Sequence, residues 1–146
     1  MRANGDRRIV IDTNIWISAW LSDNGAPAKL LKSLPNEVVV VFTTDTFVEL
    51  ESRVWKPKFD RYLSMDRRKT LLREVEGMAH WIEVPSGIKD RCYSRDPGDD
   101  KFIHAALAAD CSWLVSGDHD LLCLDPLDGL RLVSANDALQ QILWLD

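Results

Sequence analysis

Cysteines are few in this chain of 146 residues, and long apolar runs are missing. The three cysteines, Cys92, Cys111 and Cys123, are odd in number and lack the close spacing of metal ligands. They indicate reduced, structural thiols rather than a disulfide framework. No apolar run approaches the roughly 18 residues that a transmembrane helix needs. The first eight residues are not followed by an apolar signal segment with a small-residue cleavage site. We therefore expect a cytoplasmic protein with no membrane partner.

An overall basic excess is also missing, because the formal net charge is −5. The charges are unevenly distributed: eight basic residues lie between positions 53 and 73, and eight aspartates lie between positions 96 and 128. The first segment can attract phosphates and the second can hold cations. An ordinary solvated helix face explains the basic segment equally well. The chain shows no internal repeat, low-complexity tract or linker, which predicts a single domain over residues 1–146.

The most informative stretch is Ile9-Val10-Ile11-Asp12-Thr13-Asn14, where an apolar run stops abruptly at an acid. A short β-branched run of this kind favours a strand that is buried on both faces. Asp-Thr-Asn is typical of a turn or helix cap, and a helix is expected to begin near Ile15. Asp12 therefore falls at the carboxyl end of a buried strand, where ligands bind in open α/β sheets.

Similar apolar runs alternate with amphipathic segments along the rest of the chain. Strands separated by helices imply a mostly parallel sheet with helices on both faces. The fold class is thus α/β, a three-layer α/β/α sandwich around about five strands. The expected strands are 9–11, 38–42, 81–85, 112–116 and 130–133, and the main expected helices are 15–21, 28–34, 43–54, 65–79, 101–109 and 135–144.

Four acids have positions that bring them to the same edge of this sheet. Asp12 and Asp118 follow buried strands, Glu49 falls in the first turn of a helix that follows a strand, and Asp100 opens a helix that precedes one. Carboxylates that lie together repel each other unless a cation separates them. Oxygen ligands without a Cys/His set suit Mg²⁺ or Mn²⁺, which activate water and stabilise phosphoryl oxygens. The pattern indicates the chemistry of nucleases and phosphatases.

Each acid also has a purely structural interpretation. Asp12 suits a helix N-cap. Glu49 suits a capping box with Thr46, or a surface ion pair with Arg53. His104, one turn after Asp100, is interpreted as a helix-surface histidine. The remaining acids are explained equally well as helix-capping or turn residues: Asp96, Asp99, Asp100, Asp118 and Asp120.

With these motifs in place, the chain resembles a PIN domain from about Arg8 to Leu124. It is most similar to the bacterial branch assigned to the toxins of toxin–antitoxin pairs, related to VapC-type ribonucleases. The resemblance implies an α/β/α sandwich that cleaves single-stranded RNA with Mg²⁺ or Mn²⁺. It also implies a homodimer and an antitoxin protein that occupies the acidic groove. The motifs that carry it are Asp12-Thr13-Asn14, Glu49, Asp96-Pro97-Gly98-Asp99-Asp100-Lys101-Phe102-Ile103 and Ser116-Gly117-Asp118-His119-Asp120-Leu121-Leu122.

The resemblance places the catalytic and metal-binding acids at Asp12, Glu49, Asp100 and Asp118. Asp99 can take the role given to Asp100, because a shift of one residue rotates a helix position by about 100°. Residues that match supporting positions, which orient the carboxylates or water, are Thr13, Asn14, Ser116, Asp96, Asp99 and Asp120. The expected contacts to the RNA backbone come from the basic segment, at Lys56, Lys58, Arg67 and Arg68.

Two rival functions remain open from the sequence. An aspartate-based phosphatase of the haloacid-dehalogenase type needs a second aspartate two residues after the first, and this position is Asn14. The other rival is a catalytically weak or inactive module that keeps the fold and binds RNA or protein. The complete set of four acids disfavours it.

Overall fold

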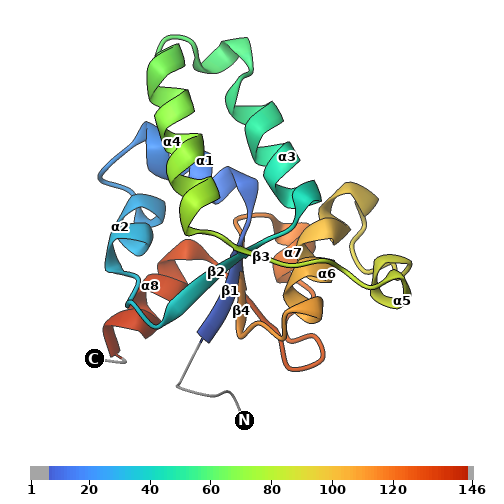
Figure 1. The fold of residues 1–146 in the computed structure, drawn as a ribbon. Helices are drawn as coiled ribbons and strands as arrows, with labels where there is room; N and C mark the ends of the chain where they lie inside the picture. The colour runs from blue at the N-terminus through green and yellow to red at the C-terminus, as the bar shows by residue number, and fades with distance from the viewer. Residues whose placement is uncertain (1–6, 145–146) are drawn as a thin grey trace.

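The computed structural model describes residues 7–144 (Figure 1). Residues 1–6 and 145–146, which include most of the segment considered above for a targeting signal, lie outside the described residues. Within residues 7–144, five strands form one sheet in the order β3-β2-β1-β4-β5, and every neighbouring pair is parallel. The expectation of a parallel sheet is confirmed. The strands are β1 (Arg7–Ile11), β2 (Val38–Phe42), β3 (His80–Trp81), β4 (Trp113–Val115) and β5 (Arg131–Val133).

Helices fill the connections between these strands, as the alternating pattern predicts. Among the described residues, no helix is long and apolar enough to cross a membrane. The α-helices are α1 (Thr13–Leu21), α2 (Ala26–Ser33), α3 (Thr44–Val54), α4 (Met65–Met78), α5 (Ser86–Lys89), α6 (Asp100–Ala108), α7 (His119–Leu122) and α8 (Ala135–Trp144). Two 3₁₀ turns, η2 (Pro57–Phe59) and η3 (Pro97–Asp99), precede α4 and α6.

The helices cover both faces of the sheet and complete the α/β/α sandwich. Figure 1 shows α2 and α8 on one side of the strands and α6 and α7 on the other. Successive side chains of a strand point to opposite faces, so Ile9 and Ile11 join one core cluster and Val10 joins the other. The first cluster contains side chains from α1, α2, α3, α4 and α8, and the second contains side chains from α6 and α7.

Element boundaries differ from the expectation in two places that matter for the site. Helix α1 begins at Thr13 rather than near Ile15, because Asp12 is its N-cap. The expected strand 81–85 is shorter and covers only His80–Trp81. One further backbone hydrogen bond joins Ile82 to Phe42, and Pro85, which has no N–H to donate, then caps α5. The chain therefore leaves the sheet early and runs on to α5 beside α6.

Candidate active site

Asp12 and Ser116 meet at the carboxyl ends of the two central strands. The backbone N–H of Asp12 donates to Val115 O at 2.9 Å, which aligns the end of β1 with the end of β4. Ser116, fully buried, then donates from Oγ to Oδ2 of Asp12 at 2.7 Å. The same Oγ accepts the backbone N–H of Asp118 at 3.0 Å. One hydroxyl therefore fixes the side chain of the first acid and the backbone of the last.

Asp12 is both a helix cap and a member of the acidic group. Its Oδ1 accepts the backbone N–H of Asn14 at 3.4 Å, and the residue is only 6% exposed. Burial raises the pKa of Asp12, the hydrogen bonds from Ser116 and Asn14 oppose that rise, and the charges of Glu49 and Asp118 add to it. The sequence suggested that Asp12 is either a helix cap or a site residue, and the structure is compatible with both. The cap orients a carboxylate whose pKa is raised by the charges of two neighbouring acids.

Glu49 lies beside this group but is held differently from the expectation. It is in the second turn of α3, not the first, and the capping box of that helix is formed by Thr43 and Thr46. Its Oε2 accepts the hydroxyl of Thr13 at 2.7 Å, and its Oε1 pairs with Lys101 Nζ at 2.8 Å. Because Thr13 directly follows Asp12, this hydroxyl ties Glu49 to the end of β1.

The helical spacing suggested an ion pair between Arg53 and Glu49, but Arg53 contacts another residue instead. Its guanidinium donates to Oδ1 of Asn14 at 3.1 Å, so it orients the side chain two residues beyond Asp12. Neither Arg53 nor Lys101 was among the site residues predicted from the sequence. The available signal for Lys101 is its position next to an acid cluster in the first turn of a helix, where a cation has an obvious counterion but an unfavourable helix dipole.

The structure separates Asp99 from Asp100, which the sequence left as alternatives. Asp100 is 4% exposed, and its two carboxylate oxygens accept the backbone N–H groups of Tyr93 at 3.3 Å and Ser94 at 2.7 Å. It therefore anchors the loop that leads into η3. Asp99, at the junction of η3 and α6, lies instead where the carboxylates of Asp118 and Asp12 raise its pKa.

Among the acids of this cluster, Asp99 has a strongly raised pKa. Burial, the hydrogen bond with Asp118, and the charges of Asp118, Asp96 and Asp12 together raise the pKa of Asp99 to about 7. Neighbouring carboxylates disfavour the charged form of a carboxyl group, which is why the proton is held more tightly by Asp99. Asp96 stays exposed and caps η3 through a 2.9 Å hydrogen bond from Gly98 N–H, and Asp120 donates its backbone N–H to Asp118 at 2.9 Å.

The donor chemistry of this edge suits a hard divalent cation. The acidic side chains offer only oxygen ligands, and a cation would compete with the proton that Asp99 holds. Within the described residues, however, no three carboxylate, imidazole or thiol groups are already arranged to hold a metal ion. The residues present are of the right chemical type to bind a divalent cation, but they are not already arranged as a complete set of ligands.

The basic residues expected to contact RNA do not form one exposed set. Lys56, Lys58 and Arg67 are exposed, in the connection between α3 and α4 and in the first turn of α4. Figure 1 shows that this connection lies at the far end of the two helices from the sheet. Arg68 is only 2% exposed, so the prediction for this residue is wrong. Its guanidinium donates to Leu63 O at 3.1 Å, pairs with Asp60 at 2.9 Å and lies 5.3 Å from the Trp55 ring centroid.

His104 is also placed differently from the expectation. It is 8% exposed rather than a surface histidine, and its Nε2 lies 2.7 Å from Arg91 O. The ring packs edge-on against Tyr93, with the centroids 6.0 Å apart. Helix α6 is buried on most of its circumference, so a polar position on it turns inward. His104 therefore supports the loop that holds Asp100.

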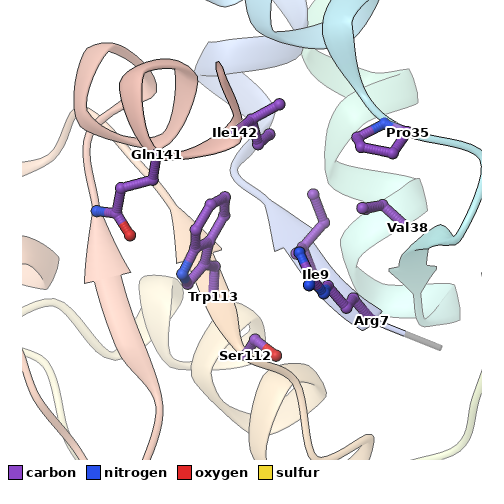
Figure 2. Close-up of a pocket in the computed structure, with 8 residues that line it drawn as sticks. All are labelled: Arg7, Ile9, Pro35, Val38, Ser112, Trp113, Gln141 and Ile142. Atoms are coloured by element: carbon purple, nitrogen blue, oxygen red, sulfur yellow. The ribbon is translucent and has the colours of Figure 1, made fainter. Parts of the chain in front are cut away.

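A cavity of about 420 Å³ lies at the opposite edge of the sheet, where β1, β2 and β4 begin (Figure 2). Figure 2 shows the Trp113 indole and Ile142 against this space, with Ile9 and Val38 from the neighbouring strands. None of the described residues that line it is an acid. This cavity is therefore separate from the acidic cluster.

Comparison with protein families matches residues 8–120 to the PIN domain. The chain belongs to the PIN domain family. An uncharacterised protein of Methanocaldococcus jannaschii is 31% identical over 118 residues, which are 80% of this chain and 74% of that relative. This membership supports a nuclease role in general, and PIN nucleases as a class use divalent metals.

Three solved structures have a fold similar to that of this PIN domain. A chain of VapBC2 from Rickettsia felis, in a complex with a promoter DNA fragment, aligns with a TM-score of 0.61 at 14% identity and covers 87% of this chain and 98% of its own. A Pyrobaculum aerophilum protein aligns with a TM-score of 0.60 at 14% identity, covering 97% and 94%. A chain of VapBC-1 from nontypeable Haemophilus influenzae aligns at 0.57 and 13%, covering 88% and 98%. The PIN-like fold expected from the sequence is confirmed.

Proposed function

We propose that residues 1–146 form a single nuclease domain that cleaves single-stranded RNA with Mg²⁺ or Mn²⁺. The observation that carries this proposal is the convergence of acids at the carboxyl ends of β1 and β4, where Ser116 contacts both the Asp12 carboxylate and the Asp118 backbone, and Thr13 contacts Glu49. An edge that gathers acids from three separate segments, without cations to neutralise all of them, is suited to a divalent ion. Asp12 and Asp118 each cap a helix of their own, α1 and α7, and the hydroxyl of Ser116 joins these two caps at one place.

In this proposal Asp12, Asp99 and Asp118 hold the metal directly or through water. Asp99 is preferred to Asp100, because the charges of Asp118 and Asp12 act on Asp99. When bound, the metal activates water and stabilises phosphoryl oxygens. Glu49 binds the metal or takes the proton of the attacking water. Thr13 and Ser116 orient the carboxylates of Glu49 and Asp12 through their 2.7 Å hydrogen bonds.

We further propose that this PIN domain is the toxin of a toxin–antitoxin pair. The support is the resemblance of its motifs to VapC-type ribonucleases and the VapBC complexes among the structures of like fold. In this role it would act in the cytoplasm as a homodimer, with an antitoxin protein as its partner. A small gene beside this one, encoding a DNA-binding segment and a short tail, would support the assignment.

Cleavage of a single-stranded RNA with Mn²⁺, with Mg²⁺ and with EDTA tests the proposal. The wild-type chain is expected to cleave with either metal and not with EDTA. Asp12→Asn is expected to abolish cleavage while the thermal midpoint of the metal-free protein stays similar or rises, because burial of the charge and repulsion are relieved. The matched control is Asp66→Asn, an exposed acid on α4. Metal-dependent cleavage by Asp12→Asn at the wild-type rate would rule out the proposal.

An inactive RNA- or protein-binding module remains a second candidate. The observation in its favour is that the described residues contain no preformed set of three metal ligands. Calorimetric titration with Mn²⁺ separates the two candidates. Binding that is lost in Asp12→Asn favours the nuclease, and no binding at millimolar Mn²⁺ favours the module.

A further inference from the structure

A second hollow lies at the same edge of the sheet as the acids, beside the ends of β2 and β3. Its volume is about 280 Å³. Parallel strands end at one common edge, so the start of α3, the segment after β3 and the start of α6 come together here. The acids Asp45 and Glu83 in its lining distinguish it from the cavity at the opposite edge, where the described lining residues include no acid.

Lys101 connects this hollow to the acidic cluster. It contributes to the lining of the hollow, and its Nζ pairs with Oε1 of Glu49 at 2.8 Å. Glu49 in turn accepts the hydroxyl of Thr13, which directly follows Asp12. One lysine therefore borders both the proposed site of phosphate chemistry and the hollow beside it. A phosphate that reached this boundary would find a cation there.

We propose that this hollow is a specificity subsite for one nucleotide of the RNA substrate, next to the phosphate that is cleaved. The inference rests on the proposed function, since it assigns a place to the substrate of that site. A pocket for a drug-sized ligand has about 300–1,000 Å³. A hollow of about 280 Å³ accordingly suits one nucleotide rather than a longer segment.

The lining fits both parts of a nucleotide. Ile82 and Val84 are half-buried and offer an apolar surface to the face of a base. Lys101, at the boundary with the acids, faces the side on which a phosphate would lie. Single-stranded RNA is recognised through the edges and faces of its unstacked bases, which is the kind of contact that this hollow allows.

Two exposed acids in the lining indicate which kind of base edge the hollow would bind. Glu83 follows β3, and Asp45 lies in the first turn of α3, where its contact with Lys89 is long at 3.9 Å and solvent-exposed. Carboxylates accept hydrogen bonds, and Asp or Glu reads the exocyclic amino group of cytosine. Cytosine, adenine and guanine carry such a donor, whereas uracil does not. The subsite is therefore expected to bind uridine more weakly, because a ring N–H is the only donor that uracil offers.

Binding of the four nucleoside 5′-monophosphates to the metal-free full chain tests this proposal without any cleavage. Calorimetry in EDTA is expected to show at least one of CMP, AMP and GMP binding roughly tenfold more tightly than UMP. Glu83→Gln, which adds an amide donor, is expected to bring UMP within about threefold of that nucleotide. Lys101→Met is expected to weaken all four together. The matched control, Glu74→Gln on an exposed position of α4, keeps the wild-type ratios.

Equal binding of all four nucleotides to the wild type would overturn the subsite, as would unchanged ratios in Glu83→Gln with an unchanged thermal midpoint. Failure of the proposed function is recognised separately, by the absence of metal-dependent RNA cleavage. If the wild type cleaves RNA but shows the same base preference as Glu83→Gln around the cut, the nuclease stands and the subsite is wrong.

Discussion

Ser116 donates a 2.7 Å hydrogen bond to Asp12 across the boundary between β4 and β1, although the two residues are 104 positions apart in the chain. The hydroxyl has a second duty, because it also accepts the backbone N–H of Asp118 at 3.0 Å. Its loss would therefore loosen two acids of the proposed site at once. The fold brings these residues together by the parallel pairing of the strands that precede them.

We predict that Ser116→Ala lowers metal affinity or RNA cleavage by about 10–100-fold, the usual cost of removing a partner that orients a metal ligand. The expected loss of unfolding free energy is about 1 kcal/mol. Calorimetry with Mn²⁺ and chemical denaturation measure the two effects. Ser18→Ala, an exposed position on α1, serves as the control. A large loss of stability with unchanged Mn²⁺ affinity would contradict the prediction.

Asp99 and Asp100 are neighbours with opposite surroundings, and their asparagine variants are expected to differ accordingly. Asp99→Asn removes a carboxylate that is coupled to Asp118, so cleavage is expected to fall at least 100-fold while the fold stays stable. Asp100→Asn places an amide N–H against one of the two backbone donors, Tyr93 or Ser94. We expect this variant to lose roughly 1–3 kcal/mol of stability.

Paired measurements of cleavage and of denaturant midpoint distinguish the two variants. The reverse result, with Asp100→Asn inactive but stable and Asp99→Asn active, would return the metal-binding role to Asp100. Two variants with equal losses of activity and of stability would mean that the start of α6 acts only as a structural unit.

The positions of the central acids could be predicted because their cause is local. Asp12 ends an uncharged apolar run, and such runs form buried strands whose ends meet at one edge of a parallel sheet. The choice between Asp99 and Asp100 could not be made this way. It depends on the backbone N–H groups of the loop at residues 93–94, which no periodicity in the sequence describes.

The burial of Arg68 was indicated by the sequence, but the charge of this residue was given more weight. Positions 68, 71, 72 and 75 follow helical spacing and are the buried residues of α4. The spacing thus placed Arg68 on the apolar side of the helix, whereas its charge and its basic neighbours suggested an RNA contact. A long side chain can bury its stem and still pair its head, which charge patterning does not detect.

The raised pKa of Asp99 leads to a prediction about the metal-free protein. An aspartate has an ordinary pKa of 3.8, and the pKa of Asp99 in the fold is about 7. The folded chain therefore holds this proton more tightly than the unfolded chain. The contribution of Asp99 to stability is complete below about pH 3.8 and is lost as the pH rises through about 7. The pKa of Asp12 is raised too, which acts in the same direction.

We accordingly expect the thermal midpoint of the wild type in EDTA, relative to that of Asp99→Asn, to decrease between about pH 4 and pH 7. The difference between the two proteins cancels the titration of groups that they share. Mn²⁺ added above pH 7 is expected to raise the wild-type midpoint and to leave that of Asp99→Asn nearly unchanged. A difference that stays constant over this range would show that Asp99 titrates as an ordinary surface aspartate.

Arg67 and Arg68 are adjacent basic residues for which the structure predicts separate effects. Arg68→Ala removes a hydrogen bond to Leu63 O and the contact with the Trp55 ring, so it is expected to cost about 2 kcal/mol of stability. Arg67→Ala removes an exposed side chain and is expected to change stability by less than about 0.5 kcal/mol. If the exposed basic residues of this segment contact the RNA backbone, Arg67→Ala also weakens RNA binding and makes it less dependent on salt. Denaturation and RNA titrations at two salt concentrations measure both effects, and equal stability of the two variants would contradict the burial of Arg68.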